Sequence, residues 1–156
     1  MAAFQLVGIA PAPFVPLFEL SDEQLRQRGA TRVLANASPG FPCRVSLEDA
    51  QVGEELLLVS YLHQPAASPY RASGPIFVRR NAKQCTLLAG EVPPYVMRRL
   101  ISVRAYDAHA MLVDAAVCAG TCVAERIHAF FRRPSVSYIH LHNAERGCFS
   151  CHVNRA

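Results

Sequence analysis

The chain has 156 residues, of which 51% are apolar and 18% charged, a composition that excludes an intrinsically disordered protein. Its 16 basic residues, all arginine except Lys83, are scattered in pairs and form no basic stripe, which argues against nucleic acid as a partner. A chain of this length can bury its own core, so we expect residues 1–156 to form one domain.

The first eighteen residues are apolar apart from Gln5, yet they fit neither a secretory signal nor a membrane span. No basic residue opens them, and Pro11, Pro13 and Pro16 would break a spanning helix. We therefore expect an extended apolar arm that starts with a strand at 4–9, no membrane segment, and a cytoplasmic location where cysteines stay reduced. The same arm is the surface through which a homodimer could form.

Local signals predict a short helix over 22–28, followed by a series of strands. Ser21 and Gln24 form a capping box in front of that helix, and Gly29 is placed to end it. Strand-like apolar runs or alternations follow at 31–36, 55–63, 75–80, 102–106, 111–118, 136–143 and 148–153.

The clearest helix is predicted over 121–133. Thr121 suits its N-cap, and Val123, Ile127 and Phe130 recur on one face. Pro134 then stops it. Many strands and few helices indicate an α+β fold with a mostly antiparallel sheet, against which this main helix packs.

The C-terminal hairpin is the part of the chain richest in chemistry. A four-residue turn at 144–147 would place His142 opposite Phe149 and His140 opposite Cys151. Strand side chains alternate between faces, so this register predicts Cys148 and His152 on the other face.

That register suggests one set of metal ligands, but other observations argue that the set binds no metal. His140, His142 and Cys151 would share a face and match the ligand count of an open zinc site. Residues 148–152 also spell the haem-attachment motif C-x-x-C-H, but without an export signal. Histidines on a half-exposed strand are usually not ligands, and a second C-x-x-C is absent. We therefore expect no metal and no cofactor.

Cys148 is a candidate nucleophile. It follows Arg146 and Gly147 on a turn, with His142 or His152 as candidate base and Asn143 as candidate orienting group. The alternative is that Cys148 is a small buried residue after a glycine turn.

Several arginines lie beside turns, strands or tyrosines and could converge on an anion. A guanidinium binds carboxylate or phosphate through paired hydrogen bonds. The candidate ligand-binding residues are Arg44, Arg71, Arg104, Tyr106, Arg146 and Arg155. The alternative for each arginine is that it braces a local loop.

Short motifs along the chain resemble those of a known family. They lie at 42–44 (Pro-Cys-Arg), 68–71 (Ser-Pro-Tyr-Arg), 74–78 (Gly-Pro-Ile-Phe-Val), 104–106 (Arg-Ala-Tyr) and 142–148 (His-Asn-Ala-Glu-Arg-Gly-Cys), with Arg155 near the end. In combination they resemble a family of small bacterial proteins known as domain of unknown function 1203. The resemblance implies a bacterial single-domain protein and no particular activity. It places Cys148 inside the family's pattern and Cys151 and His152 outside it.

Three functions follow from these observations. The first is a cytoplasmic domain that binds a small anionic ligand at the C-terminal hairpin, with arginines contributed by neighbouring elements. The second is an enzyme that uses Cys148 as nucleophile. The third is a non-catalytic module that dimerises through the N-terminal arm.

Overall fold

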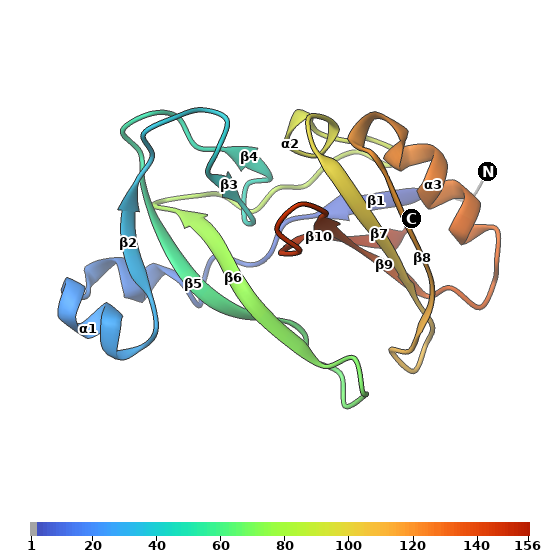
Figure 1. Ribbon diagram of the computed structural model, residues 1–156, viewed down its shortest axis with the longest axis horizontal. Helices are drawn as coiled ribbons and strands as arrows, with labels where there is room; N and C mark the ends of the chain where they lie inside the picture. Colours follow the sequence, from blue (N-terminus) through green and yellow to red (C-terminus); the bar gives the residue numbers. More distant parts are fainter. Residues whose placement is uncertain (1–2) are drawn as a thin grey trace.

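Two five-stranded sheets form the fold of the computed structural model, which describes residues 3–156, and they lie side by side (Figure 1). Sheet A has the order β1 (Phe4–Val7), β10 (Phe149–Arg155), β9 (Tyr138–Asn143), β7 (Leu100–Tyr106), β8 (Leu112–Ala119). Sheet B has the order β2 (Thr31–Leu34), β5 (Glu55–Gln64), β6 (Ala72–Arg79), β3 (Pro42–Cys43), β4 (Glu48–Asp49). Neighbouring strands are antiparallel except for the parallel pair β3 and β6. The α+β prediction is confirmed, but its single sheet is corrected to two.

The short N-terminal helix α1 (Asp22–Gln27) confirms its sequence signals. Ser21 Oγ accepts a hydrogen bond from the Gln24 backbone N–H (3.1 Å), and Gln24 Oε1 accepts one from the Ser21 N–H (2.9 Å). Gly29 follows with φ +72°, a conformation that side chains rarely adopt. A 3₁₀ turn, η1 (Val15–Glu19), precedes this helix.

The main helix α3 (Val123–Phe131) packs on sheet A and buries the predicted residues Val123, Ile127 and Phe130. It starts later than predicted because a 3₁₀ turn, η2 (Gly120–Cys122), comes first and Thr121 does not cap it. Gly120 is pressed against α2 (Pro94–Met97), where an added Cβ would lie 2.0 Å from the Val96 carbonyl oxygen. This close approach leaves no room for a side chain at the residue where the turn starts.

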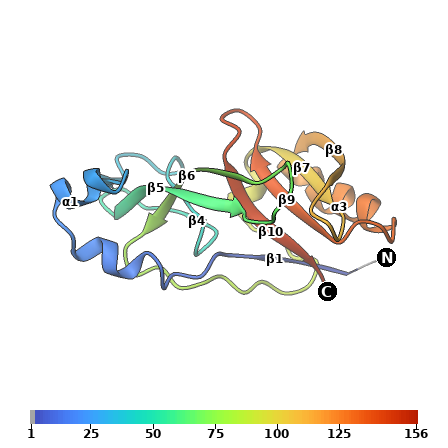
Figure 2. The same ribbon diagram turned by 90° about the horizontal axis from the view of Figure 1, so that it is seen from below.

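The N-terminal arm is packed within its own chain. Phe4 and Leu6 of β1 are completely buried in the core under α3, and Phe14 and Phe18 are buried in the core of sheet B. Figure 2 shows β1 running alongside β10, where Phe4 lies opposite Arg155. Much of the apolar surface on which the homodimer prediction rested is therefore covered, while Val15 stays 60% exposed, and dimerisation itself stays a prediction. Between residues 3 and 156, no helix is long and apolar enough to cross a bilayer.

A β-bulge in β10 changes the predicted register of the C-terminal hairpin. Phe149 lies opposite His142 as predicted, but Cys151 then lies opposite Leu141, and His152 opposite His140. Ser150 is the extra residue, and its carbonyl oxygen accepts a hydrogen bond from the buried Tyr95 hydroxyl (3.1 Å). The predictions that His140 faces Cys151 and that His152 points away from it are therefore wrong.

Candidate functional site

The face of sheet A that points away from α3 is polar and turns toward sheet B. Because side chains alternate along a strand, the residues between the apolar core positions all reach this face. They are Ser102, Arg104 and Tyr106 on β7, Tyr138, His140 and His142 on β9, and Phe149 and His152 on β10. Sheet B contributes His63 from β5, close to this surface.

Two depressions open between the sheets on either side of His63 and Phe149, which line both. The first, here called the arginine depression, has a volume of about 700 Å³ and is lined by Arg44, Arg146 and Cys148 among others. The second has a volume of about 580 Å³ and is lined mainly by aromatic and imidazole rings: Tyr61, Tyr138, His140 and His152.

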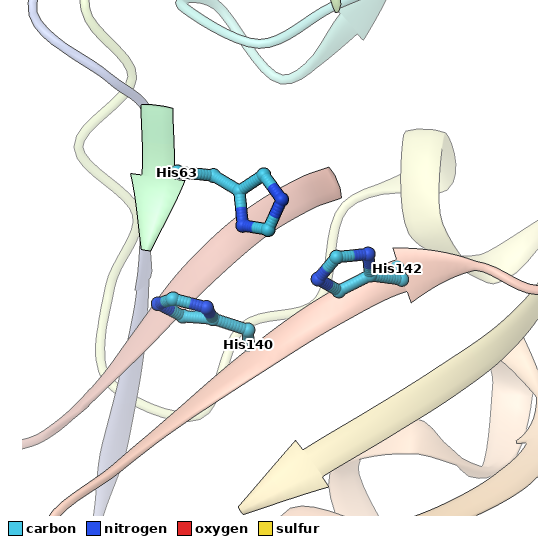
Figure 3. Close-up of side chains that lie close together, drawn as sticks. All are labelled: His63, His140 and His142. Atoms are coloured by element: carbon cyan, nitrogen blue, oxygen red, sulfur yellow. The ribbon is translucent and has the colours of Figure 1, made fainter. Parts of the chain in front are cut away.

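Three imidazoles meet where the two sheets approach each other. His63, His140 and His142 each offer one ring nitrogen, and these three atoms all lie within 4.8 Å of one another (Figure 3). We call this group the histidine triad. The ring of Phe149 packs against all three, stacked on His63 with ring centres 5.3 Å apart and edge-on to the other two. The triad is thus held between an aromatic ring and the strands of sheet A.

Hydrogen bonds determine which nitrogen of His140 and His142 carries the proton. His142 Nδ1 lies 2.9 Å from the Gly147 carbonyl oxygen, so it must donate and Nε2 is left with a lone pair. His152 Nε2 donates to Asn154 Oδ1 (2.9 Å), which makes His152 Nδ1 an acceptor. His140 Nε2, 3.1 Å from that acceptor, must therefore donate to it, and His140 Nδ1 is also left with a lone pair.

Three buried ring nitrogens of the triad have no hydrogen-bond partner within residues 3–156. They are His63 Nδ1, His140 Nδ1 and His142 Nε2, and all three are buried. Leaving a buried polar atom unbonded costs about 1–3 kcal/mol. Such an arrangement is therefore expected only where another group or a ligand satisfies these atoms.

Burial keeps the triad uncharged. It lowers the pKa of His140 to about 2 and that of His142 to about 4, in the second case against the opposing effect of the hydrogen bond to Gly147. Burial also lowers the pKa of His63. The positive charge of Arg104 acts in the same direction on all three rings. The imidazoles are therefore neutral near neutral pH.

Arg104 is the charged group of the polar face. It lies directly across from His140 in the pairing of β7 with β9, and its Nε donates to Ser102 Oγ (3.1 Å). Within the described part of the chain, no carboxylate pairs with this guanidinium. Arg104 therefore keeps hydrogen-bond donors and an uncompensated charge beside the triad.

Arg44 connects the two sheets and reaches the predicted nucleophile. Its side chain is 1% exposed and donates to the Phe149 carbonyl oxygen (2.7 Å), the Pro42 carbonyl oxygen (2.6 Å) and Cys148 Sγ (3.1 Å). Asn143 Nδ2 is a second donor to the same sulfur at 3.7 Å. Cys148 thus lies beside Asn143, as the turn length predicted, but the arginine that reaches its sulfur is Arg44 and not the neighbouring Arg146.

Neither candidate base contacts the Cys148 sulfur. His142 uses Nδ1 for the Gly147 carbonyl and directs Nε2 into the triad, while His152 bonds to His140 and Asn154. Within residues 3–156, the donors that reach Cys148 Sγ are Arg44 and Asn143. The structure thus supplies an orienting group for a nucleophile without a histidine beside it.

The other predicted site residues separate into two groups. Arg146 lines the arginine depression, and Tyr106 is buried on the polar face, stacked on Tyr138. Arg71 donates to the Pro65 carbonyl and braces the loop between β5 and β6. Arg155 packs on Phe131 and bonds to backbone carbonyls after α3, on the core side of the sheet.

The predicted metal set is not assembled, and a different residue takes part. Cys151 is completely buried on the α3 side, because the bulge at Ser150 turns it away from His140 and His142. His63 takes its place from the other sheet. The sequence placed His63 in a strand with a buried run, but gave no signal that this strand would meet β9.

The architecture is thus that of an α+β protein with an imidazole-lined cleft between two sheets. The model of the family described as "Protein of unknown function (DUF1203)" matches residues 40–155, and the chain belongs to this family. The matched segment contains the whole triad, Arg104 and Cys148. Searches of curated proteins and of solved structures found no match.

Proposed function

We propose that the protein is a binding domain for a small anionic molecule, which it takes into the arginine depression. The supporting observation is an excess of positive charge in a concave surface. Four arginines line this depression, Arg44, Arg98, Arg99 and Arg146, against one carboxylate, that of Glu145. A cleft lined by one sign of charge concentrates ligands of the opposite sign.

The ion pairs behind the depression leave this excess in place. Asp49 is buried and binds Arg98 (3.0 Å) and Arg99 together, so one carboxylate serves two guanidinium groups. Arg44 has no carboxylate partner, and Arg146 is exposed with no hydrogen bond to any residue of the described chain. Four positive charges therefore face two negative ones, a net charge of about +2 available to a ligand.

The size of the depression suits a metabolite. Its volume of about 700 Å³ falls within the range of about 300–1,000 Å³ that is usual for small-molecule sites. Apolar wall is provided by Leu58, Pro75 and Phe77, while Asn143 and the Gly147 turn add polar groups. Apolar walls with a few converging polar groups are typical of a site for an organic anion.

Calorimetric titration tests this proposal. Purified protein in EDTA is titrated with inorganic phosphate, citrate and succinate, and with glucose as a neutral control. We expect at least one anion to bind one-to-one and Arg146→Gln to weaken it about tenfold or more, because a charge-assisted hydrogen bond is lost. Arg28→Gln is the matched control, since this exposed arginine at the end of α1 carries the same charge far from the depression. Failure of all three anions, or equal loss in both variants, would contradict the proposal.

A second candidate function, chemistry at Cys148, has its own supporting observation. Two donors, Arg44 and Asn143, point at a sulfur that lines the depression. We expect iodoacetamide at about pH 7 to label Cys148 before Cys85 and Cys118, because burial raises the pKa of both other thiols. Site-by-site mass spectrometry measures the three rates. Labelling of Cys148 no faster than Cys85 would remove the nucleophile from consideration.

We also propose a bacterial cytoplasmic location for the protein. All six cysteines are free thiols, which suits a reducing compartment. The resemblance to a bacterial family supports the source.

A further inference from the structure

The strongest unassigned feature of the molecule is the set of three unbonded imidazole nitrogens in the triad. They come from β5 of one sheet and β9 of the other, and two of them carry lone pairs fixed by hydrogen bonds elsewhere on the ring. Two lone pairs directed at one buried point repel each other unless something positive or donating lies between them. We infer that the histidine triad binds one divalent transition-metal ion, for which zinc is the first choice.

The ligand chemistry agrees with this class of ion. Neutral imidazole is the commonest metal ligand and suits zinc, copper, nickel and iron, whereas calcium and magnesium prefer oxygen. The triad contains three imidazoles and neither a carboxylate nor a thiol. Ligands must be unprotonated to bind, and burial already keeps His140 and His142 neutral.

The spacing of the nitrogens is close to what a metal needs. Ligands about 2.0–2.1 Å from a tetrahedral zinc lie roughly 3.3 Å from each other. The three triad nitrogens lie within 4.8 Å of one another, so small rotations of the rings bring them onto one ion. In Figure 3 the three rings point toward a common centre, His63 from one side and His140 and His142 from the other.

The groups around the triad are those that orient metal-binding histidines. A ligating imidazole usually donates its second N–H to a carbonyl, a carboxylate or another acceptor, which fixes the ring and its tautomer. His142 does so with the Gly147 carbonyl, and His140 does so with His152, itself held by Asn154. A cluster of histidines with a purely structural role would not need N–H groups that point away from the centre of the triad and lone pairs that point toward it.

Three protein ligands leave a tetrahedral ion with one open position. Structural zinc sites normally close this position with a fourth side chain, whereas catalytic ones keep it for water or substrate. His63 lines both depressions, so an ion at the triad is accessible from the cleft. Arg104, unpaired with any carboxylate in residues 3–156, lies beside it and favours an anionic fourth ligand such as hydroxide, carboxylate or phosphate. The inference therefore goes beyond anion binding by arginines alone.

The test is zinc titration of the full chain after removal of metals with a chelator, in a buffer free of phosphate. We expect about one zinc per chain, with binding lost by more than about 100-fold in His63→Ala and His142→Ala. His152→Ala, which removes only the orienting partner of His140, should weaken binding about 10–100-fold. His109→Ala, on an exposed turn, is the matched control and should bind like the unchanged chain. Circular dichroism establishes that each variant is folded.

Cobalt substitution provides a second readout, the absorption spectrum of the bound ion. Cobalt at three imidazoles and one oxygen should give the visible bands of a tetrahedral ion without the near-ultraviolet band of a cobalt–thiolate bond. The Cys151→Ser variant should give the same spectrum. Absence of binding to the unchanged chain, retention of full affinity in His63→Ala, or a thiolate band lost in Cys151→Ser would each overturn the inference. Anion titrations in EDTA report on the arginine depression alone, so the two proposals can fail separately.

Discussion

At the centre of β9 the two faces of sheet A are almost equally inaccessible to solvent but opposite in chemistry. On β9, Ile139 and Leu141 point to α3 and are 0% exposed, while His140 and His142 point to the cleft and are 2% and 1% exposed. The apolar face gains stability from burial, whereas the cleft face loses some through imidazole nitrogens that lack partners. Burial therefore does not identify a structural core. The face with unpaired polar atoms is the one organised for binding.

Replacing Ile127 with alanine should have the largest effect, because it opens a cavity on the apolar face. Ile127 is completely buried between α3 and sheet A, and such truncations cost about 2–5 kcal/mol. Urea denaturation measures the loss. Val117→Ala, on the exposed side of β8, is the matched control and should change stability by less than about 0.5 kcal/mol. Equal costs in the two variants would show that α3 does not cover this core.

Low pH should reduce folding stability through the histidines on the cleft face of sheet A. His140 and His142 have folded pKa values of about 2 and about 4, below the unfolded value of 6.5, so the unfolded chain binds more protons between these limits. Stability is therefore lost as the pH falls below about 6.5, by roughly 2 kcal/mol for each ring at about pH 5. Urea midpoints of the metal-free protein across this range measure it. A folded state as stable at pH 5 as at pH 7, with both rings present, would contradict the burial of neutral histidines.

Removing the Tyr95 hydroxyl should reduce stability less, because it removes a single hydrogen bond at the β-bulge of β10. Tyr95→Phe leaves the buried Ser150 carbonyl without its side-chain donor and should cost about 1 kcal/mol. Tyr70→Phe removes a hydroxyl from a more exposed tyrosine and should be nearly neutral. Denaturation curves compare the two variants. If Tyr95→Phe is as stable as the unchanged protein, this bond does not hold the bulge.

The sequence predicted most elements of the fold because their signals are local. The capping box at Ser21 and Gln24, the apolar stripe of α3 and the alternating strands depend on neighbouring residues alone. Even the opposition of His142 and Phe149 followed from the length of one turn. The division into two sheets did not follow, because strand order depends on contacts between distant segments.

The sequence predicted only those site residues that lie close to one another in the chain. His140, His142, Asn143 and Cys148 were identified because they lie on one hairpin. His63 was missed because it reaches the triad from a strand of the other sheet. The pairing of His140 with Cys151 failed because no glycine or proline marks the bulge at Ser150. A buried hydrogen bond from Tyr95, distant in sequence, holds that bulge instead.

The bulge at Ser150 also determines where the chain can lose a residue. On a regular strand, deleting one residue moves every later side chain of that strand to the opposite face of the sheet, so core and cleft positions exchange. Ser150 is already the unpaired extra residue, which means that Phe149 and Cys151 lie on opposite faces as if they were consecutive. Deleting Ser150 would therefore keep Cys151 in the core and His152 beside His140. Loss of Val153 would instead move Asn154 and Arg155 to the opposite faces of the sheet and disturb the pairing of β10 with β1. Among relatives of different length, a gap at Ser150 is therefore compatible with the same two faces of β10, whereas a gap at Val153 is not.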